Sequence, residues 1–210
     1  MGKMKKIRKD IKNCHLCELR SIYNAPVPCA GSHSAKVMFI GEAPGAEEVE
    51  NCKPFVGKSG KMLRAAVLDS GLSLDDVFIT NVICCRPLNN IFPKDLKIIN
   101  TCINWLYEQI KFIQPKIIVS IGSQPHKYLR KSDIGITKAC GIWEEFNFDI
   151  NGEIYKSWYM PTLHPSFCMR GPDNRYDNPV MNLDSKGKEE LFRKNIFSVK
   201  EKLDGLKNEK

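Results

Sequence analysis

The sequence predicts an α/β protein, a three-layer sandwich in which a central, mainly parallel four-stranded sheet is flanked by helices. Two observations predict this class. Short continuous apolar runs, typical of parallel strands that are buried on both faces, occur between amphipathic helical patterns. The runs also end near Gly, Pro or Asn, at the edge where open α/β sheets carry their binding sites. The predicted strands are residues 37–40, 77–82, 116–121 and 155–160.

Apolar residues at helical spacing predict the layers that cover this sheet. The predicted helices are residues 1–13, 59–69, 94–113 and 124–130, followed by a last helix that Asp184-Ser185 caps. Residues 143–150 have weak strand character before an Asn-Gly turn, and residues 171–187 are predicted to be a polar surface loop. We expect a single domain over residues 1–210, with a charged, frayed tail at residues 205–210.

Composition restricts the class of protein and its partners. The chain has 42% apolar residues and a net charge of +8, because 32 Lys and Arg face 24 Asp and Glu. This excess favours a polyanionic partner such as nucleic acid, although Lys-rich termini alone can produce it. No apolar run approaches the roughly 18 residues of a membrane span, and no signal-peptide core follows the charged start. We therefore expect an intracellular (cytoplasmic) protein with no membrane partner. We also expect a monomer.

Cysteine usage indicates a metal or cluster site. The chain has nine cysteines, an odd number that argues against a disulfide framework when no secretion signal is present. Cys14 and Cys17 form a CxxC pair, adjacent cysteines follow the second predicted strand, and Cys102 lies in the next helix. Together they supply the four soft ligands of an iron-sulfur cluster or zinc. A redox pair, a chance CxxC and free core cysteines are the alternatives.

The loop after the first predicted strand is the first candidate for chemistry. Gly41 ends the strand, and Glu42, Glu47 and Glu48 place carboxylates where the sheet edge opens into a crevice. An acidic surface turn is the alternative. Phe55 follows in a loop bounded by Pro and Gly, where it is either a core residue or a stacking platform for a flat ligand.

Two more strand ends carry polar side chains. Asn81 lies near the end of the second strand, where its amide either reads the edge of a nucleobase or caps the next turn. His164 follows the fourth strand and precedes Pro165, which restricts its backbone to an extended conformation. A lone histidine is usually a satisfied surface or core residue, but the fixed backbone and the crevice position favour a function here.

In this order and spacing, the motifs resemble the uracil-DNA glycosylase superfamily, and most closely its iron-sulfur family, known as family 4. The resemblance covers residues 11–170. It rests on Cys14-x-x-Cys17 with Glu18-Leu19, Gly41-Glu42-Ala43-Pro44-Gly45 with Glu47, Pro54-Phe55-Val56-Gly57-Lys58-x-Gly60, Thr80-Asn81-Val82 with Cys85-Arg86-Pro87, Cys102, the strand Ile117 to Gly122, and His164-Pro165-Ser166 with Arg170.

The resemblance implies a structural [4Fe-4S] cluster held by Cys14, Cys17, Cys85 and Cys102, which joins the N-terminal segment to the core. Cys84 is the rival of Cys85, but only Cys85 precedes the Arg-Pro of the pattern.

The resemblance also implies that the protein flips uracil out of single- or double-stranded DNA and hydrolyses its N-glycosidic bond, leaving an abasic site. The implied catalytic residues are Glu42, which positions or activates water, and His164, which stabilises the departing base. Uracil binding is assigned to Gly41, Ala43, Glu47, Phe55, Asn81, Asn89 and Asn90, and DNA binding to Ser166, Met169 and Arg170. For Glu47, closing the pocket at C5 of uracil and a solvated turn position remain equal alternatives.

Two departures from the family pattern affect the site. Ile91-Phe92 stands where family members have an arginine, which puts the DNA-holding role of this loop in question. Glu47 is followed by Glu48-Val49-Glu50-Asn51-Cys52, so the segment that leads to Phe55 is expected to run differently.

Two rival functions belong to other classes. One is a uracil-DNA-binding protein without turnover or with covalent capture, although covalent relatives carry a basic loop with a histidine after the second strand. The other is a cluster-bearing accessory domain that docks DNA or a polymerase. The sequence does not identify a replication or repair partner.

Overall fold

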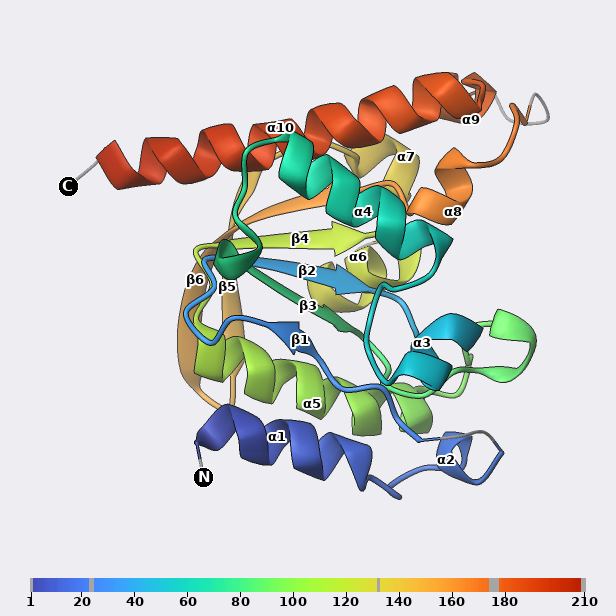
Figure 1. Ribbon diagram of the computed structural model, residues 1–210, viewed down its shortest axis with the longest axis vertical. Helices are drawn as coiled ribbons and strands as arrows, with labels where there is room; N and C mark the ends of the chain where they lie inside the picture. The colour runs from blue at the N-terminus through green and yellow to red at the C-terminus, as the bar shows by residue number, and fades with distance from the viewer. Residues whose placement is uncertain (1, 23–24, 132, 174–177, 209–210) are drawn as a thin grey trace.

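The computed structural model describes residues 2–22, 25–131, 133–173 and 178–208. A six-stranded sheet runs through the centre of the molecule, in the order β1-β3-β2-β4-β6-β5 (Figure 1). The strands are β1 (Ala30–Gly31), β2 (Val37–Gly41), β3 (Val77–Asn81), β4 (Ile117–Ile121), β5 (Glu144–Ile150) and β6 (Glu153–Thr162).

The four central strands, β3, β2, β4 and β6, are parallel and correspond to the four strands predicted from the sequence. The sheet has two further strands, because β1 pairs antiparallel with β3 and β5 pairs antiparallel with β6. The turn between β5 and β6 is formed by Asn151 and Gly152, which both have positive φ, as an Asn-Gly hairpin turn requires. The three-layer α/β sandwich is thus confirmed, with a wider, mixed sheet.

Helices cover both faces of this sheet (Figure 1). On one face lie α1 (Lys3–Lys12), α5 (Leu96–Ile113) and α6 (Ser123–Arg130), and on the other α4 (Lys58–Asp69) and α10 (Ser185–Asn208). The short helices are α2 (Leu19–Ile22), α3 (Ala46–Asn51), α7 (Ile136–Ala139), α8 (Pro165–Cys168) and α9 (Pro179–Asn182), and two 3-10 turns are η1 (Leu74–Asp76) and η2 (Leu88–Asn90).

Successive residues of β2 divide the core into two layers. Met38 and Ile40 pack on the α5 side, whereas Val37 and Phe39 pack on the side of α4 and α10. This alternation follows from the period of two in a strand, and because all four side chains are fully buried the run reads as continuously apolar. Burying each such side chain stabilises the fold by about 1.5–3 kcal/mol.

Three segments differ from the prediction. The acidic loop after β2 contains α3, the polar region 171–187 contains α9 and the start of α10, and residues 205–208 continue α10 instead of fraying. Residues 174–177 and 209–210 of the predicted loop and tail lie outside the described residues.

The topology places a crevice at the carboxyl ends of β2 and β4. The chain leaves β2 toward α4 on one face and leaves β4 toward α6 on the other, so the connections of these adjacent strands diverge. Such a switch point is where open α/β sheets bind ligands.

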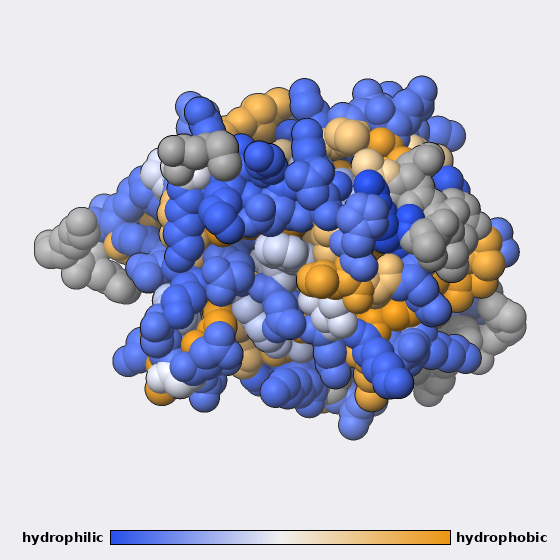
Figure 2. Space-filling view, turned by 90° about the horizontal axis from the view of Figure 1, so that it is seen from below, coloured by the Kyte–Doolittle hydropathy of each residue, from blue (hydrophilic) through white to orange (hydrophobic). Residues whose placement is uncertain are grey.

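The side of the molecule that carries α1 is largely hydrophilic (Figure 2). Lys3, Lys5, Lys9 and Lys12 are exposed on this helix, while Met4, Ile7 and Ile11 are buried beneath it. In the described part of the chain, no helix combines the length and the apolar character needed to cross a membrane.

Candidate active site

A cavity of about 650 Å³ opens at the carboxyl edge of the parallel strands. Its walls come from the segments that follow β2, β4 and β6, from the end of β3, and from α7, α8 and α9. It is lined by Glu42, Ala43, Pro44, Gly45, Ala46, Glu48, Phe55, Ser59, Asn81, Arg86, Pro87, Asn90, Gly122, Ser123, Ile136, Thr137, Leu163, His164, Ser166, Phe167, Arg170 and Met181.

Most residues that the sequence assigned to the site lie in this lining. The structure brings together Glu42, Ala43, Phe55, Asn81, Asn90, His164, Ser166 and Arg170. Gly41, Glu47, Asn89 and Met169 are not among the lining residues. Glu42 and His164, at the ends of two different strands, thus face one cavity.

Gly41 lies directly behind the cavity and leaves room for two lining side chains. A Cβ atom at this position would lie 2.5 Å from Oδ1 of Asn81 and 2.5 Å from Cζ of Phe55. Gly41 and Asn81 are also register partners in the parallel pair β2 and β3. Because residue 41 has no side chain, the Asn81 amide and the Phe55 ring can both pack against its backbone.

The Phe55 backbone adopts a left-handed conformation, with φ of 54°, that is rare for an aromatic residue. Its carbonyl passes so close to Gly60 that a Cβ there would lie 1.9 Å from the Phe55 oxygen. Nε of Arg64 donates to the same oxygen at 3.2 Å. A side chain held in such a strained backbone conformation points to a function, because the surrounding contacts must maintain it.

Glu48 fixes the segment that contains Phe55. One of its carboxylate oxygens accepts from the N–H groups of Val56 and Gly57, at 2.9 and 2.8 Å, and the other accepts from the N–H of Gly45 at 3.1 Å. Hydrogen bonds to a charged acceptor contribute about 1.5–3 kcal/mol each. Glu48 therefore links the start of α3 to the Phe55 turn, and it lines the cavity itself.

Glu47, the acid that sequence reasoning assigned to uracil, is exposed on α3. Its carboxylate lies beside Gly57, where a Cβ atom would be 2.9 Å from Oε1 of Glu47. The structure thus places Glu48, not Glu47, at the cavity wall.

The ring of His164 is held in one tautomer. Its Nδ1 atom accepts from the backbone N–H of Ser166 at 3.1 Å and lies 2.7 Å from the Ser166 hydroxyl oxygen. Since a backbone amide can only donate, Nδ1 is unprotonated and the neutral ring carries its proton on Nε2. The ring lies 6.4 Å from that of Phe55, centroid to centroid.

Burial lowers the pKa of His164 to about 4, and the positive charge of Arg170 adds to this effect while Glu48 opposes it. Gly122 makes the close packing of this residue feasible, because it has φ of +96° and a Cβ there would lie 3.1 Å from Cβ of His164. The ring is therefore neutral at physiological pH and offers an N–H donor.

Glu42 begins the loop after β2 and is partly buried in the cavity wall. Its backbone carbonyl accepts from the N–H of Ile83 at 3.2 Å, which continues the β2–β3 ladder past the last paired residues. Burial raises the pKa of its carboxyl group above the ordinary value. A carboxylate with raised pKa in a partly buried cavity suits a general base.

The loop after β3 contributes two polar residues. Nε of Arg86 donates to Oδ1 of Asn90 at 2.9 Å, and both side chains line the cavity. Asn89 is exposed outside the lining. Of the two residues that replace the arginine of the family pattern, Ile91 is 67% exposed, whereas Phe92 is buried and stacks on Tyr128.

The segment that begins with α8 forms one lip of the cavity. Ser166 and Arg170 line it, and Arg170 is exposed. Met169 lies on the outer side of the lip with 43% of its surface exposed. This arrangement suits contact with a nucleic acid backbone more than contact with a base inside the cavity.

Four cysteine thiols lie close enough to influence one another. Burial, followed by the negative charges of Cys102, Cys17 and Cys14, raises the pKa of Cys85 to about 12, while Arg20 lowers it. Burial is likewise the main cause of the raised pKa of Cys17, and Cys102 and Cys14 contribute. Burial and mutual repulsion thus oppose ionisation of these thiols, and a bound metal centre would supply the positive charge that favours their thiolate forms.

The donor set of this region consists of cysteine thiols. Among the described residues, no three His, Cys, Asp or Glu side chains are grouped as ligands of one metal ion. The chemistry of the four thiols fits a [4Fe-4S] cluster, because such clusters take cysteine thiolates as ligands.

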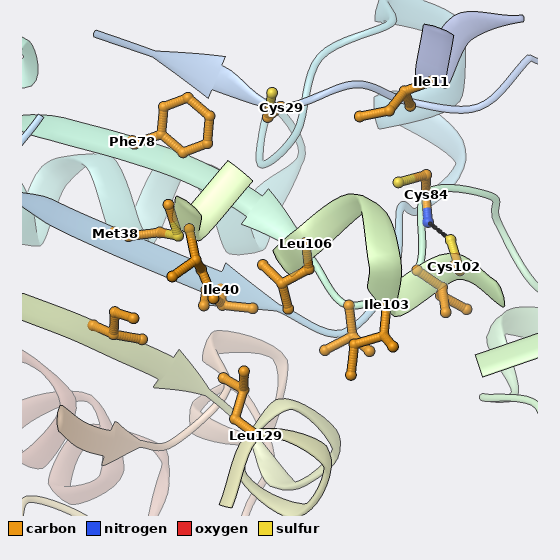
Figure 3. Packing of buried hydrophobic residues seen from close by; sticks show 14 of the residues in the cluster. Ile11, Cys29, Met38, Ile40, Phe78, Cys84, Cys102, Ile103, Leu106 and Leu129 are labelled. Atoms are coloured by element: carbon orange, nitrogen blue, oxygen red, sulfur yellow. Dashed lines mark hydrogen bonds between the residues drawn. The ribbon is translucent and has the colours of Figure 1, made fainter. Parts of the chain in front are cut away.

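Cys84, the rival ligand, points into the core around Cys29 (Figure 3). Its backbone N–H donates to Sγ of Cys102 at 3.2 Å. Hydrogen bonds from Cys84 lower the pKa of the Cys102 thiol. A hydrogen bond between its thiol and Cys102, followed by burial, raises the pKa of Cys84. Neither Cys14 nor Cys17 acts on the Cys84 thiol, whereas both act on Cys85.

Several lining residues were missed by sequence reasoning. Arg86 lies inside a quoted motif, but nothing in the sequence separated it from its neighbours, and Glu48 was named only as one of three acids at the crevice, without a role of its own. Thr137 and Met181 come from the short helices α7 and α9, which lack a periodic signal. Nδ2 of Asn178 donates to Oγ1 of Thr137 at 3.0 Å, which joins these two helices at the cavity rim.

Comparison with known proteins bears on this site. Residues 28–186 match the family model of the Uracil DNA glycosylase superfamily. The type-4 uracil-DNA glycosylase of Sulfurisphaera tokodaii is 36% identical over 83% of this chain and 80% of that protein. The type-4 uracil-DNA glycosylase of Saccharolobus solfataricus is 36% identical, over 83% and 81%. That of Thermotoga maritima is 31% identical, over 88% and 93%. The chain therefore belongs to the uracil DNA glycosylase superfamily and, within it, to the type-4 family.

Proposed function

We propose that this protein excises uracil from DNA by hydrolysing the N-glycosidic bond between the base and deoxyribose. The observation that carries the proposal is that Glu42 and His164 line one cavity together with Phe55 and Asn81. A base is inaccessible to attack inside the duplex stack, so the nucleotide must swing out into a pocket of this kind. The names of the type-4 relatives support the same reaction.

Phe55 and Asn81 hold the extruded base in this proposal. The Phe55 ring stacks on the flat face of uracil, an interaction worth about 1–3 kcal/mol per base. The Asn81 amide donates to O4 of uracil and accepts from N3–H. Cytosine reverses this pattern of donors and acceptors, so its binding would leave buried polar groups unpaired, with a penalty of about 1–3 kcal/mol for each.

Bond cleavage places negative charge on the departing uracil and positive charge on the sugar. In the proposal, the Nε2–H of His164 donates to O2 of uracil and stabilises the developing anion. Glu42 in its ionised form positions and activates the attacking water and offsets the charge of the sugar. Losing one such preorganised group typically lowers the rate by about 100- to 1000-fold.

The rim of the cavity engages the DNA strand in this proposal. Ser166 and Arg170 contact the phosphate backbone beside the flipped nucleotide, and Met169 presses on the neighbouring bases. Asn90 and the backbone N–H groups of the loop that contains Ala43 assist in holding the substrate. The exposed lysines of α1 contribute sequence-independent attraction to the polyanion.

We further propose that Cys14, Cys17, Cys85 and Cys102 hold a [4Fe-4S] cluster. When bound, the cluster supplies structural cross-linking, because its ligands come from the segment after α1, the loop after β3 and helix α5.

A strand-scission assay tests the function. The protein is incubated with a single strand that contains one uracil and then treated with alkali, which cleaves only at an abasic site. We expect scission at the uracil and none in the matched strand with thymine. The Glu42→Gln variant is the matched control for turnover. If the wild-type protein binds the uracil strand but leaves it intact, the enzymatic proposal is wrong and a binding protein remains.

A further inference from the structure

Lys188 is a charged residue that the site described above does not use. It lies in the first turns of α10 and has 0% of its surface exposed. Its Nζ atom donates to the carbonyl oxygen of Gly171 at 2.7 Å and to that of Arg170 at 3.3 Å. The same nitrogen lies 4.5 Å from the centroid of the Phe167 ring. Two of the residues it contacts, Phe167 and Arg170, line the cavity.

A buried lysine needs a physical reason. Removing an ammonium group from water costs several kcal/mol unless its donors are satisfied. No carboxylate in the described part of the chain forms an ion pair with Lys188, and its compensation comes from two carbonyl oxygens and the face of an aromatic ring. A methionine would fill the same space without this cost. The contacts of the ammonium group therefore identify the backbone that it holds in place.

What Lys188 holds is the far end of the cavity lip. The helix α8 begins directly after His164, and its last turn is closed by the bond from the Arg170 N–H to the Phe167 carbonyl. Arg170 and Gly171 are both exposed, so their carbonyl groups could otherwise bond to water. Helices α8 and α10 lie side by side at this point (Figure 1). The ammonium group turns these carbonyls inward and thereby fixes the backbone that carries the Arg170 side chain.

We propose that Lys188 is a positioning residue that fixes Arg170 at the cavity mouth, so that the Arg170 guanidinium meets a DNA phosphate beside the flipped nucleotide. The inference rests on the proposed DNA substrate. Its signature is dependence on Arg170, because a residue that acts through another loses its effect when the other is absent.

A double-mutant cycle tests this dependence. Fluorescence anisotropy measures binding to a single strand that contains a tetrahydrofuran abasic-site analogue, which the protein cannot cleave. We expect Arg170→Ala to weaken binding about tenfold and to reduce the salt slope by about 1. Lys188→Met should weaken binding to a similar extent. The double variant should bind no more weakly than Arg170→Ala alone. If the double variant instead binds about hundredfold more weakly than the wild-type protein, which is the product of the two separate losses, the proposal is wrong.

Two controls separate positioning from charge and from folding. Lys186→Met removes an exposed lysine two positions earlier in the same helix, and we expect near wild-type binding. If it weakens binding as much as Lys188→Met, the effect is general charge and the proposal is wrong. Should Lys188→Met fail to fold, Lys188→Gln keeps uncharged donors near the carbonyls. Its loss of binding must also vanish in the Arg170→Ala background, or the proposal fails.

The readouts distinguish this inference from the proposed function. Strand scission at uracil by the wild-type protein reports on the enzymatic proposal alone. If scission is absent while the binding cycle shows dependence on Arg170, only the enzymatic proposal falls. If scission is normal and the cycle is additive, only the role of Lys188 falls.

Discussion

The backbone N–H of Ser166 donates to Nδ1 of His164 over 3.1 Å, in the first turn of α8. This single bond determines which ring nitrogen carries the proton, and it leaves Nε2–H as the group that a ligand in the cavity meets. Protonation of the ring would turn Nδ1 into a donor facing another donor. The bond therefore opposes the charged imidazolium, in the same direction as the burial that lowers the pKa of His164 to about 4.

The first prediction concerns pH. The pKa of Glu42 is raised above its usual value by burial, so the required carboxylate form is lost first as pH falls. The required neutral form of His164 is lost only near pH 4. We expect the single-turnover rate of the wild-type protein to be level at neutral pH and to decline on the acid side with the titration of Glu42. In Glu42→Gln, the lower residual rate should decline only near pH 4. A decline centred near 6.5 in this variant would contradict the neutral, buried ring.

The second prediction concerns Gly41. In Gly41→Ala, the added methyl group would meet both Asn81 and Phe55 at 2.5 Å, so both side chains must move. Loss of stacking alone corresponds to about 1–3 kcal/mol. We expect uracil-DNA affinity to fall roughly 5- to 150-fold, with the melting temperature as the control for folding. Wild-type affinity in this variant would show that the two side chains do not hold the base.

The third prediction separates two adjacent acids. Glu48→Gln converts a carboxylate that accepts three backbone N–H bonds into an amide, which loosens the Phe55 turn. We expect a lower excision rate and a loss of stability of about 1–3 kcal/mol in urea unfolding. Glu47→Gln alters an exposed carboxylate and should change stability much less. Excision of thymine by Glu47→Gln, but not by Glu48→Gln, would support the pocket-closing alternative for Glu47.

The fourth prediction concerns the thiols. Cys85→Ser removes a ligand that interacts with Cys14, Cys17 and Cys102, so we expect loss of bound iron, sulfide and visible absorption. Cys84→Ser alters a buried thiol that interacts with Cys102 but with neither cysteine of the CxxC pair, and it should keep the absorption. The readouts are iron and sulfide content and the visible spectrum. Bleaching by Cys84→Ser alone would reverse the ligand choice.

The fold and much of the site follow from local patterns. A strand that is buried on both faces needs an uninterrupted apolar run, and such runs identified the four parallel strands. Glu42, Asn81 and His164 each lie at or just after the end of one of these strands. Because parallel strands share a carboxyl edge, sequence position alone was sufficient to place the three side chains around one crevice.

The remaining parts depend on tertiary packing. Which of two neighbouring glutamates faces the cavity is decided by the rotation of α3, a helix of six residues with no buried residue and no periodic signal. β1 has only two residues, so its pairing with β3 leaves no pattern. Lys188 belongs to a charged sequence, and its burial follows from the approach of Phe167 in α8 and of the Arg170 and Gly171 carbonyls just after α8.

The position of β6 in the sheet has a consequence for biogenesis. β6 pairs with β4 and β5, and the segment that follows it carries His164. The pairing of β6 with β5 is local, whereas its parallel pairing with β4 joins residues far apart in the sequence, and long-range pairing of this type is slow. Recovery of catalysis after dilution from denaturant should accordingly lag behind the return of helical circular dichroism. The rate at which turnover returns would then report on the pairing of β6 with β4, which brings His164 to the cavity.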